Sequence, residues 1–178
     1  MSERDAGAKR TTGRIEAIWL KRAHRGPMDP VQRARLVAGG GIADDANFGR
    51  SRRQVTVIEK EAFERIADRL PAADPAMRRA NVMVSGLGLQ GTRDRILSLG
   101  GVRLHVRGET RPCERMDAQC PGLTAALDPD WNGGVFGVVL DDGEIAVGDV
   151  AELGAAELDG RPARTGRGFQ APTERPGA

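Results

Sequence analysis

The chain has 178 residues, long enough for one domain of ordinary size and too short for two domains with a linker. Its 27 basic and 25 acidic residues leave a net charge of +2, and only 3% of its residues are aromatic. The chain therefore lacks both the charge excess and the stacking side chains typical of a nucleic-acid-binding protein, and we expect no nucleic-acid partner.

The two ends of the chain are predicted to be disordered. Residues 1–13 are polar or small and lack the apolar segment of a secretory signal. Residues 154–178 are rich in Gly, Pro, Arg and Ala and show almost no apolar periodicity. No run between these ends approaches the length needed to cross a membrane. We therefore expect a folded domain over residues 14–153, in a reducing, cytoplasmic setting and without a membrane partner.

Most of the folded region has the pattern of short strands. Apolar residues alternate with polar ones, or form short β-branched runs between glycines, near residues 14–20, 31–38, 54–58, 82–87, 96–99, 101–107, 135–140 and 144–150. The last two strands are predicted to form a hairpin around an Asp-Gly turn. Residues 59–70 form the one clear amphipathic helix. This pattern predicts a mainly β fold, a closed or partly closed barrel, because a doubly wound sheet would need more helices.

Basic segments supply candidate sites for an anion. Lys21 begins a basic loop that could hold a phosphate, although charge alone fits a solvated loop better. Arg53 ends a second arginine-rich segment, directly before a strand. Arg79 and Asn81 combine a guanidinium with an amide, a pair that can bind an anion and a base edge but can equally satisfy loop carbonyls.

Cys113 is the candidate nucleophile or metal ligand. It follows a strand and the sequence Thr110-Arg111-Pro112, in which Thr110 suits a helix N-cap and proline suits the first helical turn. We therefore expect a short helix at the cysteine. A helix N-terminus and flanking arginines both favour the thiolate, the form that acts as a nucleophile or binds a soft metal. The alternative is a small, buried apolar residue.

The second cysteine, Cys120, is expected to be structural. It lies seven residues after Cys113, so along a persistent helix the two Cα atoms would be about 10 Å apart, beyond the reach of a disulfide. It also precedes Pro121, where a helix should end. A minor alternative is a resolving thiol, if that end of the helix frays.

Together these segments resemble the MOSC domain, the family of molybdenum-cofactor sulfurase C-terminal domains and their stand-alone bacterial relatives. The matching pieces occur in family order over about residues 14–153 and are Gly26-Pro27-Met28, the glycine run 39–41 with Asp44, Arg53-Gln54-Val55-Thr56-Val57, Arg79-Ala80-Asn81-Val82, Leu99-Gly100-Gly101-Val102-Arg103-Leu104, Arg111-Pro112-Cys113-Glu114-Arg115-Met116, Gly133-Gly134-Val135-Phe136-Gly137 and Val147-Gly148-Asp149. The family has a β-rich, barrel-like fold, as the strand pattern predicts independently. Ala43 stands where the family pattern has a glycine before the aspartate, which weakens any role for Asp44.

The resemblance implies that Cys113 carries sulfane sulfur as a persulfide or binds molybdenum through its sulfur. A soft thiolate suits both roles. It also implies that Arg79 and Asn81 contact the pterin of the molybdenum cofactor, and that the loop at Lys21 lies where relatives hold the phosphate. We expect the cofactor site to be completed by Arg53, Thr110 and Arg111.

The resemblance also implies partners. Full sulfurases carry a pyridoxal-phosphate desulfurase domain, for which this chain has neither the length nor a Schiff-base lysine segment, so no pyridoxal phosphate is expected here. Relatives that reduce N-hydroxylated compounds need an electron donor, and two cysteines cannot form an iron–sulfur site. We expect an electron-transfer protein if Cys113 binds the metal, and a cysteine desulfurase if Cys113 carries sulfur. A third hypothesis is a barrel that binds an anionic small molecule, with Cys113 merely buried.

Overall fold

The computed structural model of the protein describes residues 11–50 and 52–156. Its strands are β1 (Thr11–Lys21), β2 (Met28–Val31), β3 (Arg33–Val37), β4 (Gly41–Ile42), β5 (Val55–Glu59), β6 (Val82–Ser85), β7 (Arg95–Leu99), β8 (Val102–Glu109), β9 (Val135–Val139), β10 (Gly143–Ala146) and β11 (Val150–Ala156). Its helices are α1 (Lys60–Ala67), α2 (Arg115–Gln119) and α3 (Leu123–Leu127), with 3-10 turns η1 (Pro75–Arg78) and η2 (Pro129–Trp131). The first and last strands extend three residues beyond the predicted domain at each end; the rest of both predicted disordered segments lies outside the described residues.

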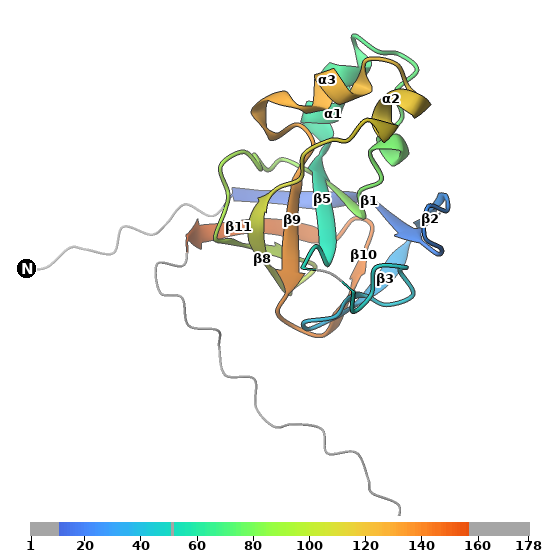
Figure 1. Ribbon diagram of the computed structural model, residues 1–178. Coiled ribbons are helices and arrows are strands. Elements are labelled where there is room, and N and C mark those ends of the chain that lie inside the picture. Colours follow the sequence, from blue (N-terminus) through green and yellow to red (C-terminus); the bar gives the residue numbers. More distant parts are fainter. Residues whose placement is uncertain (1–10, 51, 157–178) are drawn as a thin grey trace, which may run out of the picture.

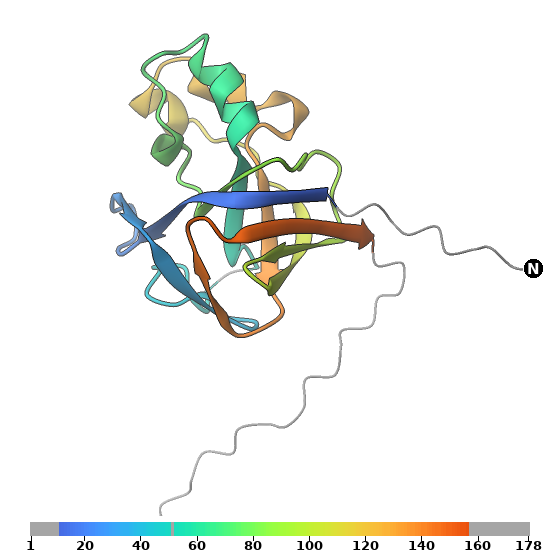
Figure 2. The same cartoon turned by 180° about the vertical axis from the view of Figure 1, so that it is seen from behind.

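Seven strands close into a barrel. Their hydrogen-bonded order is β11-β7-β8-β9-β5-β6-β1, and β1 pairs back with β11 between Thr11–Arg14 and Val150–Leu153. Figure 2 shows β1 and β11 side by side, where the ring closes. The strands β10, β3 and β4 form a separate small sheet, and β2 extends β1 outside the ring. The prediction of a mainly β, barrel-like fold is confirmed.

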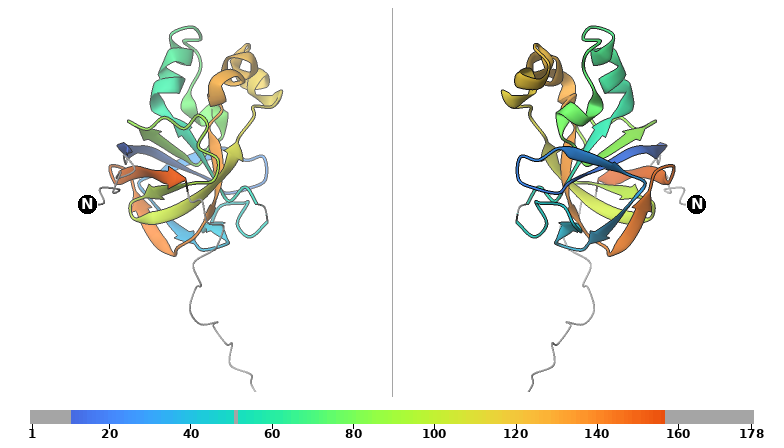
Figure 3. Two further views of the ribbon diagram at one scale, coloured as in Figure 1. Left: turned by 90° about the vertical axis from the view of Figure 1, so that its left-hand side faces the viewer. Right: turned by 90° about the vertical axis from the view of Figure 1, so that its right-hand side faces the viewer.

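The helices gather over one end of the barrel (Figures 1 and 3). The β5 and β6 strands pair in parallel, whereas the other neighbours in the ring are antiparallel. Parallel neighbours need a crossover connection, and α1 and η1 supply it above the barrel. None of the described helices combines the length and the apolar character needed to cross a membrane.

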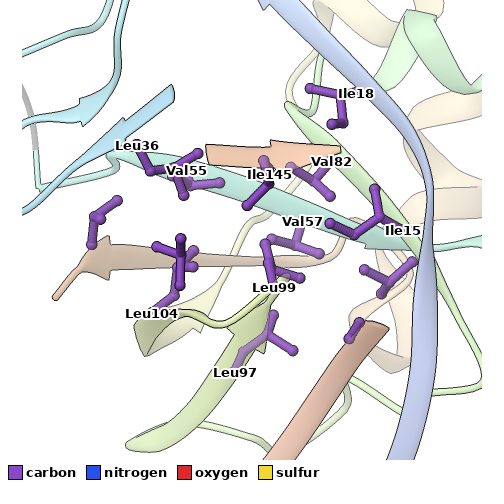
Figure 4. Packing of buried hydrophobic residues seen from close by; sticks show 14 of the residues in the cluster. Ile15, Ile18, Leu36, Val55, Val57, Val82, Leu97, Leu99, Leu104 and Ile145 are labelled. Carbon is purple, nitrogen blue, oxygen red and sulfur yellow. The ribbon is translucent and has the colours of Figure 1, made fainter. Parts of the chain in front are cut away.

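The barrel core follows from alternation along the strands. In β8, the side chains of Val102, Leu104 and Val106 are buried, whereas Arg103 and Arg107 are exposed on the outer face. Figure 4 shows core residues from different strands packed together, among them Leu97, Leu99, Leu104, Val57 and Ile15. Burial of such apolar surface is the main stabilising contribution to the fold.

A second apolar cluster lies under the helices. It joins Phe63 and Ile66 of α1 to Met116 of α2, and it includes Leu123, Leu127 and Cys120. Cys120 is only 4% exposed, as expected of a structural cysteine. This cluster fixes α2 and α3 relative to the barrel, and with them the segment that carries Cys113.

The predicted hairpin of residues 135–140 and 144–150 is wrong. The β9 strand pairs with β5 and β8, whereas β10 pairs with β3. The intervening acidic residues bind elsewhere: Asp141 accepts hydrogen bonds from the backbone and side chain of Arg103, and Asp142 accepts one from Ala38 N. These contacts direct β10 away from β9 and into the small sheet.

Candidate functional site

Cys113 lies in the segment that joins β8 to α2. Its thiol is free and its side chain is exposed, which excludes the hypothesis of a buried cysteine. Its carbonyl oxygen accepts hydrogen bonds from Met116 N at 2.9 Å and from Thr124 Oγ1 at 3.2 Å. The helix begins at Arg115, so Cys113 precedes the helix and does not lie in its first turn.

Thr110 does not cap that helix, and the predicted N-cap is wrong. The backbone N–H of Thr110 donates to Gly134 O at 2.8 Å, which continues the pairing of β8 with β9 and keeps this residue out of the helix. The side chain is 4% exposed, and its Oγ1 has no hydrogen-bond partner within the described residues. A buried hydroxyl without a partner is unfavourable. This oxygen is therefore a candidate contact for a bound group.

Arg78, which the sequence did not single out, lies behind this segment. It is only 6% exposed, and its Nε and Nη2 donate to Gly133 O at 2.8 Å and to Thr110 O at 2.9 Å. Burial lowers the pKa of Arg78 to about 10, a charge on Cys113 raises it, and Arg53 lowers it. The guanidinium therefore keeps its charge at neutral pH.

The sequence could not separate Arg78 from Arg79. The two arginines are adjacent, but Arg79 takes a left-handed backbone conformation with φ 60° at the end of η1. Its Nη2 donates to Gly26 O at 2.8 Å, in the loop between β1 and β2. The turn at Arg79 thus directs one guanidinium toward the cysteine segment and the other toward the basic loop.

Lys21 and Asn81 belong to one network around a buried carboxylate. The amide of Asn81 donates to Asp45 Oδ2 at 3.2 Å and accepts from Thr56 N at 3.1 Å. Asp45 also accepts from Lys21 N at 2.9 Å, and the Lys21 ammonium donates to Asn47 Oδ1 at 2.9 Å. Asp45, and not Asp44, is therefore the buried carboxylate that holds this network together. A sequence signal existed, since two aspartates follow the glycine run, but nothing in it indicates which one is buried.

The remaining predicted residues lie on the outer surface. Arg53 places its guanidinium carbon 5.2 Å from the ring centre of Phe136, within cation–π distance. Arg111 is exposed and lies 3.6 Å from Glu109 Oε2. The structure thus brings Cys113, Thr110 and Arg53 together around Arg78. It brings Lys21, Asn81 and Arg79 together around Asp45 and the loop at Gly26.

Comparison with known proteins identifies a family. The model of the MOSC domain matches residues 43–152. No curated protein matches the chain. Similar crystal structures include YuaD from Bacillus subtilis, with 23% identity and a TM-score of 0.70 over 82% of this chain and 97% of that chain. YiiM from Escherichia coli has 16% identity and a TM-score of 0.61, over 82% of this chain and 72% of that one. YiiM from Geobacillus stearothermophilus has 17% identity and a TM-score of 0.67, over 82% and 77%. At these identities the three structures show a shared fold alone.

Proposed function

Because the chain belongs to the MOSC domain family, we propose that it binds the molybdenum cofactor with Cys113 as a sulfur ligand of the metal. The family is associated with this cofactor. The observation that carries the proposal is a free, exposed thiol at Cys113, in a segment that begins where the buried guanidinium of Arg78 holds Thr110 O. A thiolate is a soft ligand of the kind that binds such metals.

The residues of the site fit an anionic, metal-bearing group. The unpartnered Thr110 Oγ1 offers a hydrogen-bonding atom beside the cysteine segment. Arg53 and Arg111 add positive charge for the anionic part of the cofactor, and guanidinium groups suit phosphate oxygens. In this proposal Arg79, Lys21 and Asn81 hold the loops that border the site, because their side chains already bond within the protein.

The proposed reaction is the reduction of N-hydroxylated compounds, in which R–NH–OH takes up two electrons and two protons and gives R–NH₂ and water. The bound cofactor would supply the redox chemistry. Cys113 would hold the metal. We propose that a separate electron-transfer protein in the cytoplasm delivers the electrons.

The exposure of Cys113 also favours a second candidate, a sulfur carrier. A Cys113 thiolate would attack the outer sulfur of a persulfide on a cysteine desulfurase. The bond between the two desulfurase sulfurs breaks, the desulfurase thiolate leaves, and Cys113 becomes the persulfide. An exposed cysteine is accessible to such a partner protein.

Metal analysis of the full chain from a host that makes the cofactor tests the first proposal. We expect Cys113→Ser to retain less than roughly a tenth of the wild-type molybdenum, because the hydroxyl is a harder and weaker ligand. Cys120→Ala, the matched control in the apolar cluster, should retain wild-type molybdenum. Equal molybdenum in Cys113→Ser and wild type would overturn metal binding through Cys113. A sulfur mass increment on Cys113 after treatment with a desulfurase, in protein without molybdenum, would instead support the carrier.

A further inference from the structure

We propose a second binding site, for a diphosphate-type anion, in a pocket on the outer face of β9. The pocket has a volume of ≈ 790 Å³ and is lined chiefly by Arg50, Arg52, Gln54, Arg107, Phe136 and Val138. Phe136 and Val138 alternate with the buried residues of β9, so they project from the outer side of the barrel.

The pocket lies toward the end of β5 that is remote from the helices. The β5 strand runs from Val55 directly into α1, so the segment 52–54 is at its opposite end (Figure 1). Cys113, in contrast, follows Glu109, which pairs with Val135 at the start of β9, and it leads into α2. The pocket therefore does not include the Cys113 segment, but it borders the proposed cofactor site at Arg53, whose guanidinium lies over Phe136.

The pocket concentrates positive charge. Its lining contains the arginines Arg50, Arg52 and Arg107 and no carboxylate, in a chain whose net charge is only +2. The side chains of Arg50 and Arg52 form no hydrogen bond or ion pair with other residues that the structure describes. Neighbouring positive charges repel one another, and an anion bound between them attracts each of them and offsets that repulsion.

One arginine is held in place by a chain of polar contacts. Arg107 Nη1 lies 3.4 Å from His105 Nδ1, and His105 Nε2 lies 3.1 Å from Asp94 Oδ1. A guanidinium can only donate, so Nδ1 accepts and the ring proton sits on Nε2, where it faces the carboxylate. This arrangement uses one Arg107 N–H and leaves its other donors for a ligand.

The wall beside the arginines is also fixed. Gln54 donates through Nε2 to Gly39 O at 2.7 Å and accepts at Oε1 from Val139 N at 2.9 Å. The Arg53 guanidinium lies over Phe136, which adds a further positive charge next to the pocket. A site with fixed donors loses less entropy when it binds a ligand.

These features favour an anion with two phosphate groups. Planar guanidinium groups bind phosphate oxygens through paired hydrogen bonds, and three of them exceed what one carboxylate requires. The volume lies within the roughly 300–1,000 Å³ of small-molecule sites. The chemical class is therefore pyrophosphate itself or a nucleoside diphosphate.

Calorimetric titration of the full chain at low ionic strength, in a phosphate-free buffer, tests the proposal. Pyrophosphate and ADP should bind, and adenosine should not. Arg107→Gln and the double variant Arg50→Gln with Arg52→Gln should each weaken pyrophosphate binding roughly tenfold or more, since each removes charge-assisted hydrogen bonds. Arg65→Gln, an exposed arginine of α1 outside the pocket, is the matched control and should change the affinity less than about twofold.

Absence of pyrophosphate binding would overturn the proposal. So would equal weakening by Arg65→Gln, which would show a general response to charge, or binding of adenosine as tight as that of ADP. Cys113→Ser separates this proposal from the cofactor proposal: its pyrophosphate affinity should equal that of wild type whether or not its molybdenum is lost. A tenfold weaker affinity in Cys113→Ser would assign the anion to the cofactor site and overturn a separate pocket.

Discussion

Gly134→Ala is expected to destabilise the protein by roughly 3 kcal/mol or more. Gly134 has φ 88°, a conformation that L side chains rarely adopt, and its N–H donates to Trp131 O at 2.8 Å. A Cβ at this position would overlap the carbonyl oxygen of Val57 and would lie 2.9 Å from Ile58 Cγ2. Both neighbours belong to β5, so relief of the overlap requires movement of a barrel strand. Urea unfolding of the variant, compared with wild type, measures the loss.

Gly101→Ala is the matched control. Gly101 has nearly the same backbone angle, φ 87°, but nothing lies within 4 Å of a Cβ built on it. The substitution should lower the free energy of unfolding by only about 1 kcal/mol, which is the cost of the left-handed backbone conformation without a steric overlap. If the two variants lose the same free energy of unfolding, the close approach of Gly134 to β5 does not contribute to the effect of the substitution.

Arg78→Met is expected to lower the free energy of unfolding by about 2–4 kcal/mol. The variant keeps a similar volume, but the carbonyl oxygens of Thr110 and Gly133 lose their buried donors. Unfolding of the variant in urea, compared with wild type, measures this loss.

Two further variants separate charge from hydrogen bonding. Arg78→Lys keeps the charge but not the forked donors, so it should recover only part of the stability that Arg78→Met loses. Arg79→Met removes the partly exposed neighbour and should cost only about 1 kcal/mol. Equal losses of unfolding free energy in Arg78→Met and Arg79→Met would contradict a special role for Arg78.

The pH dependence follows from the lowered pKa of Arg78, about 10. Below that value the guanidinium is charged in both the folded and the unfolded protein, so its contribution to stability is constant from about pH 6 to 9. Above it the folded protein releases the proton before the unfolded protein does, so stability rises with pH on account of this group. Urea unfolding at about pH 6 and at about pH 9 should therefore show the same loss of unfolding free energy in Arg78→Met.

The barrel was predictable because each strand carries its own pattern. Alternation in residues 102–107 defines which face is buried, and the β-branched run of β5 matches a strand buried on one side and covered by a helix on the other. The partner of each strand was less predictable. The Asp141-Asp142-Gly143 turn looks like a hairpin in sequence, but side-chain contacts to Arg103 and Ala38 N decide the direction of the next strand.

The site was predictable at the cysteine and less so around it. A thiol between arginines after a strand is a local feature, and the segment is where the structure shows an exposed cysteine. The buried guanidinium is supplied by the 3-10 turn η1, far away in sequence, and a single left-handed residue decides which of two arginines turns inward. The choice between Asp44 and Asp45 likewise depends on the backbone N–H of Lys21, which only the fold brings to Asp45.

Alkylation of the full chain with and without bound cofactor tests most directly whether Cys113 is a ligand of molybdenum. In cofactor-free protein, iodoacetamide should modify the exposed Cys113 and leave the buried Cys120 unmodified. In molybdenum-loaded protein, a sulfur bonded to the metal is no longer a free nucleophile, so modification of Cys113 should slow at least tenfold while Cys120 stays unmodified. Equal alkylation rates of Cys113 in the two forms, at full molybdenum content, would contradict ligation through this sulfur.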